Sequence, residues 1–339
     1  MEKNTRQEIL KLLKQSDGFV SGQELSDRIG ISRTAVWKAV GRLKEEGYTI
    51  EAVTNRGYRL LSASEDLLNE AELTEGFKDA KWIGHPVIFK EETGSTNADI
   101  FALSDSGAEE GTIAVASFQS AGKGRRGRQW LSPAKGNVYT SLLLKPALSP
   151  DAAPVITLLA ALGAWEAACA VAGRDDLIFI KWPNDLVGIG PDGKARKLTG
   201  ILTEMRLEES EIKDIVVGIG LNVNEKDFPG EIAETATSFS LLLGRDISRV
   251  ELTCRMWKAF ETLYDIYLSE KGFQGIKERY EKALINIGRT VRVLDPKDPF
   301  TGVAKGVNET GALLVETEEG KIIPVSAGEV SVRGVNGYV

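Results

Sequence analysis

Apolar side chains recur at helical spacing three times near the start of the chain. Residues 4–15, 21–30 and 33–46 each carry them three and four positions apart, which predicts three short helices. A serine stands where the N-cap of the second and of the third helix is expected. Residues 48–61 then alternate between apolar and polar around a Thr-Asn-Arg-Gly turn, which predicts a hairpin. This order of elements is typical of a winged helix-turn-helix.

The third of these helices is expected to enter the major groove of DNA. The predicted contacts with DNA, the last of them on the hairpin, are Ser32, Arg33, Thr34, Trp37, Lys38 and Arg56. A protein-interaction module could use the same elements, so that alternative stays open. Residues 1–61 hold eleven Lys and Arg against eight Asp and Glu, a net charge of +3, whereas the chain carries −7. This difference is compatible with nucleic-acid binding without demonstrating it.

The middle of the chain mixes strand and helix patterns. Runs rich in Val, Ile and aromatic residues predict strands at 85–92, 111–119, 137–146, 176–182, 198–207 and 214–224. Helical patterns fall at 96–106, 153–172, 250–270 and 273–285. Because the loops are short, we expect an α/β domain with a mixed, largely antiparallel sheet.

From Asn286 the chain turns to short alternating strands separated by Gly, Asp and Asn. This pattern predicts a small C-terminal β-barrel of the SH3-like kind. The fold class is therefore α+β with several domains. The expected domains are a winged helix-turn-helix at 1–65, an α/β domain at 66–285 and the barrel at 286–339.

Composition narrows the class of protein. With 42% hydrophobic and 27% charged residues, the chain can bury a core as a soluble protein. Two cysteines and one histidine provide neither a disulfide framework nor a metal site made by the protein, so we expect a reducing, cytoplasmic compartment. The apolar stretch 152–173 is interrupted by Pro154 and Glu166, which indicates a buried helix and no association with a membrane.

Residues 121–130, AGKGRRGRQW, form a basic loop interrupted by glycines. Glycines let backbone N–H groups approach phosphate oxygens, and arginines add paired hydrogen bonds, so this loop is suited to a polyphosphate. Its glycine spacing also matches a dinucleotide-binding motif, but Pro133 follows where a helix would have to begin. Residues 188–195 resemble a P-loop without its final Ser or Thr. A solvated basic turn is the remaining alternative.

Residues 215–224, IVVGIGLNVN, alternate with a period of two. One face is apolar, and the other carries Gly218, Gly220, Asn222 and Asn224. A bare glycine floor next to amides could hold a flat polar ligand. The alternative is a strand that crosses close to another backbone.

Three further motifs place polar groups near strand ends and helix starts. In KWPND, Lys181, Asn184 and Asp185 leave a buried strand together. In RKLTGIL, Lys197 precedes a strand in which Gly200 permits close approach. GSTN, residues 94–97, offers hydroxyl and amide groups at a helix N-terminus, which suits a carbonyl or ureido group. A plain N-cap is the alternative for this motif.

Taken together, these stretches resemble the bacterial bifunctional biotin protein ligases and biotin operon repressors. The predicted winged domain, GSTN, QSAGKGRRGRQW, KWPND, RKLTGIL, GIGLNVN and the terminal barrel follow the family's order over essentially the whole chain. KWPND followed by KLTGIL and GIGLNVN is specific in combination, whereas the basic loop alone is a weak signal.

The resemblance implies roles for individual residues. Arg125 and Lys197 match the positions on which the family's chemistry depends. The implied biotin-binding residues are Ser95, Thr96, Asn97, Gln119, Gly122, Lys123, Gly124, Arg125, Lys197, Gly200 and Gly218. The implied ATP- or adenylate-binding residues are Arg126, Arg128, Trp130, Lys181, Asp185 and Asn222. Lys123 replaces the arginine usual in the family, which keeps the charge and loses the forked hydrogen bonds.

The resemblance also implies the reaction and its partners. ATP and Mg²⁺ would convert biotin to biotinyl-5′-AMP, which serves both as the intermediate and as the corepressor. The implied partners are the biotin carboxyl carrier domain of carboxylases, palindromic operator DNA of biotin genes and a second copy of the chain in a ligand-promoted homodimer. A lipoate ligase, a DNA-binding sensor without ligase activity and a NAD-dependent enzyme are the competing hypotheses.

Overall fold

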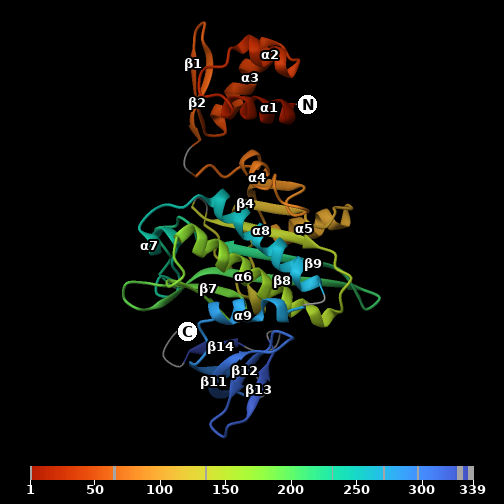
Figure 1. The fold of residues 1–339 in the computed structure, drawn as a ribbon, viewed down its shortest axis with the longest axis vertical. Coiled ribbons are helices and arrows are strands. Elements are labelled where there is room, and N and C mark those ends of the chain that lie inside the picture. Colours follow the sequence, from red (N-terminus) through yellow and green to blue (C-terminus); the bar gives the residue numbers. More distant parts are fainter. Residues whose placement is uncertain are drawn as a thin grey trace. The chain divides into compact units, whose positions relative to one another are not determined.

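The computed structural model describes seven stretches of the chain, namely residues 2–63, 66–133, 136–230, 232–269, 272–295, 298–326 and 331–334. The chain divides into two compact units, Met1–Glu75 and Gly76–Val339 (Figure 1).

The first unit contains the three predicted helices and the predicted hairpin. Its elements are α1 (Glu2–Lys14), α2 (Gly22–Ile29), α3 (Arg33–Glu45), β1 (Tyr48–Val53), β2 (Gly57–Ala63) and α4 (Glu70–Gly76), of which α4 was not predicted. Both predicted N-caps are confirmed: the Ser21 hydroxyl accepts from the Glu24 amide at 3.0 Å, and that of Ser32 accepts from the Ala35 amide at 3.2 Å. Apolar side chains from α1, α2, α3 and β1 form one core.

The hairpin is attached to the connection between α1 and α2. Val20 and Tyr58 exchange two backbone hydrogen bonds, of 2.8 and 2.9 Å. Gly57 has a φ of +105°, and a Cβ there would lie 2.1 Å from the Val20 carbonyl oxygen. Only glycine satisfies both constraints, so it sets how closely the hairpin approaches the helices.

The second unit is built on the predicted mixed sheet. Its seven strands stand in the order β3-β4-β5-β9-β8-β7-β6. Their bounds are β3 (Val87–Thr93), β4 (Ile113–Gln119), β5 (Val138–Leu144), β6 (Ile178–Lys181), β7 (Asp185–Ile189), β8 (Ala195–Glu208) and β9 (Glu211–Leu221). Only the pair β3–β4 is parallel among these neighbours.

Strand β7 was not predicted. Its sequence runs directly into a Gly-Pro-Asp-Gly turn, which hides the short apolar run. In the structure β6 and β7 form an antiparallel hairpin, so that Lys181 pairs with Asp185 across it. The hairpin therefore keeps these two polar residues adjacent, where the sequence predicted only a polar turn.

Four helices of the described residues pack against this sheet, namely α5 (Thr96–Asp105), α6 (Ala153–Ala172), α7 (Phe239–Leu243) and α8 (Arg249–Leu268), and α9 (Gln274–Ala283) packs against α6 and α8. Single 3₁₀ turns stand at Arg125–Gly127 and Pro150–Ala152. Helix α6, with the residues just before it, is long and apolar enough to span a membrane by composition. Most of its middle is buried, however, where it packs against α8 and the sheet.

The C-terminal part of this unit is a β domain, as predicted. Its antiparallel strands stand in the order β13-β12-β11-β10-β14. Their bounds are β10 (Thr290–Leu294), β11 (Phe300–Val307), β12 (Leu313–Glu316), β13 (Ile322–Val325) and β14 (Ser331–Gly334). Within the described residues, β13 and β14 are the two edges, so the sheet does not close into the barrel that was expected.

The close approach of α6 and α8 yields a prediction. A Cβ on Gly163 would lie 3.0 Å from the Phe260 amide nitrogen and 3.2 Å from the Met256 carbonyl oxygen. We expect Gly163→Val to lower the free energy of unfolding by about 1–3 kcal/mol, the usual cost of overpacking. Urea unfolding would measure this, with Gly230→Ala as the control, because a Cβ at Gly230 meets no atom within 4 Å. Equal stability of the two variants would contradict the prediction.

Candidate functional site

A glycine-floored pocket of about 470 Å³ opens beside β8 and β9. Every residue predicted to bind biotin lines it except Gly122. The lining comes from the start of α5, the end of β4, the basic loop and strands β8 and β9. The structure thus brings together side chains that lie more than a hundred positions apart in the sequence.

One end of this pocket is a hydrogen-bonded polar cluster. The Gln119 Oε1 atom accepts from the Thr96 amide at 2.8 Å and from the Thr96 hydroxyl at 3.1 Å. The buried Ser141 hydroxyl lies 2.7 Å from Thr96 Oγ1 and 2.6 Å from Asn97 Oδ1. Since one hydroxyl carries one proton, Ser141 donates to only one of them at a time. Ser95 stands at the N-cap position but makes no side-chain cap hydrogen bond.

The floor of the pocket is bare backbone, as the alternation in β9 predicted. A Cβ on Gly218 would lie 2.0 Å from Asn97 Oδ1, and one on Gly220 would lie 2.6 Å from the Trp130 indole. Gly200 of β8 is equally close, with its ideal Cβ 2.5 Å from Trp130. Any larger residue at these positions would displace the groups that rest on the floor.

The predicted glycine-and-amide face ends earlier than expected, because β9 ends at Leu221. Asn224 belongs to the framework, since its Nδ2 atom donates to the Ile247 carbonyl at 2.8 Å. Asn222 is buried and lines neither this pocket nor the next one. Its Nδ2 atom donates to the Lys197 carbonyl at 3.4 Å, so it supports the strand that carries Lys197.

An arginine-lined pocket of about 670 Å³ adjoins the first one. Arg126, Arg128, Lys181 and Asp185 line it, together with Val332 and Arg333 of β14. Five residues line both pockets, namely Gly124, Arg125, Trp130, Asn184 and Lys197. These residues form the shared wall, across which groups bound in the two pockets would meet.

Lys197 is held in this shared wall by two contacts. Its Nζ atom lies 2.7 Å from the Asp185 carboxylate and 5.0 Å from the centre of the Trp130 ring. Asp185 is buried at the start of β7, so its position is determined by the β6–β7 hairpin. The ammonium group is therefore held between the two pockets by the protein's own side chains.

Two other cations of the site are partly desolvated. Burial lowers the pKa of Lys181 to about 8, although the nearby Asp185 carboxylate opposes that shift. Its Nζ atom donates to the Val332 carbonyl at 3.3 Å. Burial also lowers the pKa of Arg125, whose Nη1 atom donates to Asn184 Oδ1 at 3.1 Å. Both cations would interact more strongly with a phosphate here than in water.

The glycines of the basic loop allow it to fold back on itself. Gly124 donates to the Arg128 carbonyl at 2.7 Å, and Trp130 donates to the Gly122 carbonyl at 3.0 Å. Gly122 does not line the pocket, and a Cβ there would lie 2.7 Å from the Trp130 carbonyl oxygen, so the return of the loop requires glycine at this position. Arg126 and Gly127 are left-handed, with φ of +60° and +72°. The resulting turn directs the loop toward both pockets.

Sequence reasoning missed several residues that line these pockets or hydrogen-bond to side chains that do. Ser141 lies in a strand that reads as fully buried, and Glu204 reads as a surface position of β8, so neither carried a signal. Arg333 belongs to a separate β domain, and only the tertiary structure brings it to the arginine-lined pocket. Asn184 was noticed in KWPND but was not assigned a role.

A divalent cation bound in the arginine-lined pocket would have few protein ligands. Within the stretches that the structure describes, no three His, Cys, Asp or Glu side chains gather as metal ligands. Asp185 contributes one carboxylate to the arginine-lined pocket and Asn184 one amide. This donor set fits Mg²⁺ that is bound mainly by a substrate's phosphates and by water.

The first unit presents the predicted DNA-binding residues on its surface. Ser32, Arg33, Thr34, Trp37 and Lys38 are all exposed along one side of α3, and Trp37 is 66% exposed. The opposite side of the helix is buried in the core. Arg56 is exposed on the hairpin, and its guanidinium lies 4.5 Å from the centre of the Phe19 ring. Ser32 also caps α3, so it has a structural role whether or not it contacts DNA.

Residues 91–222 match the biotin/lipoate A/B protein ligase family, residues 5–59 match an HTH domain, and residues 287–333 match the biotin protein ligase C-terminal domain.

The matching proteins are similar over most of their length. The chain is 38% identical to the bifunctional ligase/repressor BirA of Bacillus spizizenii, over 94% of this chain and 96% of that protein. It is 28% identical to the protein of the same name from Escherichia coli, over 98% and 99%. A solved biotin protein ligase from Aquifex aeolicus, in complex with biotin and ATP, matches with a TM-score of 0.62 at 31% identity, over 73% of this chain and 98% of that one. The chain belongs to the family of bifunctional biotin protein ligases and repressors.

Proposed function

We propose that this protein activates biotin with ATP, transfers it to a lysine of a biotin carboxyl carrier domain, and uses the same activated biotin as corepressor. The observation that carries the proposal is the shared wall, where Lys197 and Arg125 line both pockets. A carboxylate in one pocket and an α-phosphate in the other would meet at these two cations.

Biotin occupies the glycine-floored pocket. Its ureido group meets the polar cluster of Ser95, Thr96, Asn97 and Gln119, and its chain runs over the glycine floor. Lys123 and Gly124 close over it from the basic loop. The carboxylate then points at the shared wall. ATP occupies the arginine-lined pocket, where Arg126, Arg128 and Lys181 offset the charge of its phosphates. Asn222 supports this region from beneath the Lys197 strand.

The first step brings two anions together. A biotin carboxylate oxygen attacks the α-phosphorus, a new P–O bond forms, and the bond to the β-phosphate breaks with release of pyrophosphate. Lys197 and Arg125 offset the repulsion and stabilise the charge that develops on the phosphoryl oxygens. Lys197 leaves its contact with Asp185 when the carboxylate arrives, because one ammonium cannot hold both carboxylates equally well. Trp130 covers the product, biotinyl-5′-AMP.

Mg²⁺ would be held by the phosphates of ATP and by Asp185, with Asn184 beside it. The cation supplies neutralisation of the departing pyrophosphate. No dedicated metal site of the protein is proposed.

The second step transfers the acyl group. The neutral amine of a carrier-domain lysine attacks the acyl carbon of biotinyl-5′-AMP, an amide bond forms, AMP leaves with the electrons of the broken C–O bond, and the amine proton passes to solvent. Neither step requires a covalent bond between enzyme and substrate.

We propose biotin, and not lipoate, as the substrate for two reasons. The ligase family that matches residues 91–222 includes both classes. A match to the biotin-specific C-terminal domain at 287–333 and the polar end of the glycine-floored pocket both support biotin. The dithiolane ring of lipoate carries no N–H or C=O group to satisfy this polar end.

Repression would use the first unit. An adenylate-promoted homodimer would present two helices α3 to a palindromic operator of biotin genes. We assign the winged domain to 1–65, the ligase domain to 66–285 and the C-terminal β domain to 286–339. The reaction is placed in the cytoplasm, where biotin, ATP and carrier proteins meet.

The first prediction of the proposed function concerns adenylation. Exchange of labelled pyrophosphate into ATP should require biotin. We expect Lys197→Ala and Arg125→Ala each to slow it by about 10²–10³-fold, the usual effect of removing one group that stabilises transition-state charge. Lys194→Ala is the control, because Lys194 is exposed on a turn and lines neither pocket. Exchange with lipoate alone would move the protein to the lipoate ligases, and no exchange with either acid would leave a DNA-binding sensor.

The second prediction follows from the lowered pKa of Lys181, which is about 8. The ammonium is charged below this pH and loses its charge above it, so kcat/KM for ATP should fall as the pH rises from 7 to 9. Lys181→Gln should have a lower value at pH 7 and a flatter profile. Steady-state exchange rates at saturating biotin measure this. Identical pH profiles for the two proteins would contradict the role of Lys181.

The third prediction concerns DNA. Trp37→Ala should weaken binding to DNA selected from a random-sequence pool by about 1–3 kcal/mol, by loss of an apolar contact with the bases. Lys38→Ala should weaken binding to all sequences. It should also reduce the slope of the logarithm of the binding constant against the logarithm of the salt concentration by about one. Lys11→Ala on α1 is the control, and fluorescence anisotropy with biotin and ATP present is the measurement. Unchanged binding by both test variants would exclude α3 as the reading helix.

A further inference from the structure

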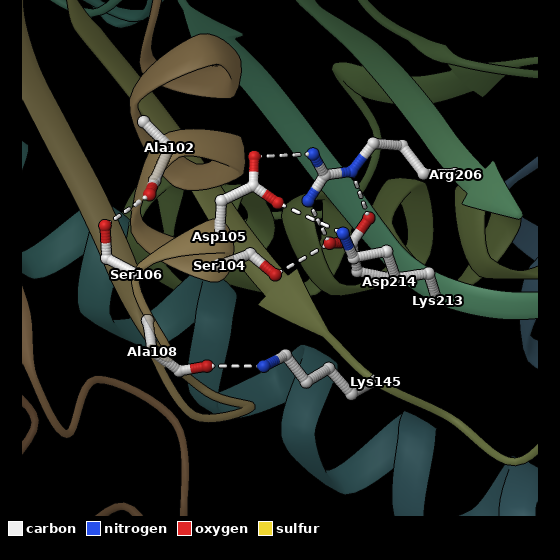
Figure 2. Close-up of polar contacts among 9 residues, drawn as sticks. All are labelled: Ala102, Ser104, Asp105, Ser106, Ala108, Lys145, Arg206, Lys213 and Asp214. Atoms are coloured by element: carbon white, nitrogen blue, oxygen red, sulfur yellow. Dashed lines mark hydrogen bonds and ion pairs between the residues drawn. The ribbon is translucent and has the colours of Figure 1, made fainter. Parts of the chain in front are cut away.

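Helix α5 lies along β9, and side chains near both of its ends contact β9 and the neighbouring strand β8. Its first turn brings Thr96 and Asn97 to the glycine-floored pocket. Its last turn joins a group of charged and polar residues at the other end of the strands (Figure 2). This far-end cluster consists of Ser104, Asp105, Arg206, Lys213 and Asp214.

The far-end cluster is centred on an ion pair between the buried Asp214 carboxylate and the partly exposed Arg206. Asp214 is fully buried and accepts two hydrogen bonds from Arg206, one of them from Nε at 2.9 Å. The Ser104 hydroxyl donates to the same carboxylate at 2.7 Å. Arg206 also donates to Asp105 at 2.9 Å and lies 4.6 Å from the centre of the Phe101 ring. One arginine thus joins both strands to the last two turns of the helix.

The helix and the strands match in spacing. Gly218, Val216 and Asp214 lie on one face of β9, two residues apart, and pair across the ladder with residues 202, 204 and 206 of β8. From Asp214 to Gly218 the strand rises roughly 13 Å, and from Asn97 to Ser104, which are three plus four residues apart through Ile100, the helix rises about 10.5 Å, so the two run nearly in step. Asn97 therefore meets the first pair and Ile100 packs against Val216 at the second, while Ser104 meets the third.

The pocket end of this arrangement tolerates little axial displacement of the helix. Asn97 lies directly on the Gly218 backbone, and its Nδ2 atom donates to Glu204 at 2.6 Å and to the Leu202 carbonyl at 3.4 Å. The middle contact, Ile100 on Val216, is apolar and non-directional, so it resists sliding weakly. Beyond Asn97, the directional bonds between α5 and these strands are at the far end, where Ser104 donates to the Asp214 carboxylate and Asp105 accepts from Arg206.

We propose that the Asp214–Arg206 pair is a positioning element for the biotin pocket, which holds α5 at the axial position where Thr96 and Asn97 meet the ligand. This inference rests on the proposed function. The pair touches no substrate, and none of its residues lines either pocket. A displacement of about 1 Å at a binding group is enough to cost up to 10²-fold in rate, so a small shift of the helix would be felt in the pocket.

The chemistry of the pair supports a directional role. Burial would raise the pKa of Asp214, yet the hydrogen bonds from Arg206 and Ser104 hold it below its usual value. Buried ion pairs often add little to stability when compared with apolar pairs of similar volume, and in some proteins they specify geometry instead. That distinction allows stability and positioning to be separated by experiment.

The test compares two Michaelis constants in biotin-dependent pyrophosphate exchange. Asp214→Asn should raise the KM for biotin by about tenfold, within the range expected for a displaced binding group. The KM for ATP should stay unchanged, because α5 does not line the arginine-lined pocket. Calorimetric titration with biotin alone should show the same loss of affinity.

Two further variants keep the test informative if Asp214→Asn fails to fold. The double variant Arg206→Met with Asp214→Leu replaces the pair by apolar groups and should fold, yet its KM for biotin should rise as in Asp214→Asn. Ser104→Ala removes one hydrogen bond between the helix and the carboxylate, and a smaller rise is expected. Asp176→Asn is the matched control, since it breaks an exposed Arg174–Asp176 pair with similar bidentate geometry.

The outcomes separate the two proposals. If the unmodified protein shows no biotin-dependent exchange, the proposed function fails. If it does, and folded variants of the pair keep the KM for biotin of the unmodified protein, the positioning role fails. A parallel rise in the KM for biotin and for ATP would also overturn it, because it would indicate a general loss of structure.

Discussion

The ion pair between Lys197 and Asp185 is the interaction on which the site depends, because it holds a cation in the wall shared by the two pockets. Asp185 starts β7, and its position follows from the β6–β7 hairpin and from the pairing of β7 with β8. Lys197 stands on β8 opposite Val187. The sheet register therefore determines where two anionic substrates can meet.

The bare floor of β8 and β9 is the second constraint. Gly200, Gly218 and Gly220 let Trp130 and Asn97 rest directly on backbone, at distances that no side chain would allow. The same absence of side chains creates room for a flat ligand. The pocket therefore needs other elements to hold its walls in place, and we assign that role at the far end of α5 to the Asp214–Arg206 pair.

The C-terminal β domain contributes to the chemistry through contacts with the central sheet. Lys181 donates to Val332 of β14, and Arg333 lines the arginine-lined pocket. Burial beside this domain is the main cause of the lowered pKa of Lys181. The motif KWPND indicated a polar group at this strand end, and the packed β domain gives that lysine a pKa of about 8.

Local patterns in the sequence determined most helices, most strands, both serine caps and the glycine face of β9, because each depends on neighbouring residues. The motifs also indicated Lys197, Arg125 and the residues of GSTN. Only the tertiary structure decided that Asn222 lies behind the pockets, that Ser141 and Glu204 orient Asn97, and that Arg333 reaches the site. These facts depend on strand order and on contacts between distant segments, and neither leaves a periodic signal along a single chain.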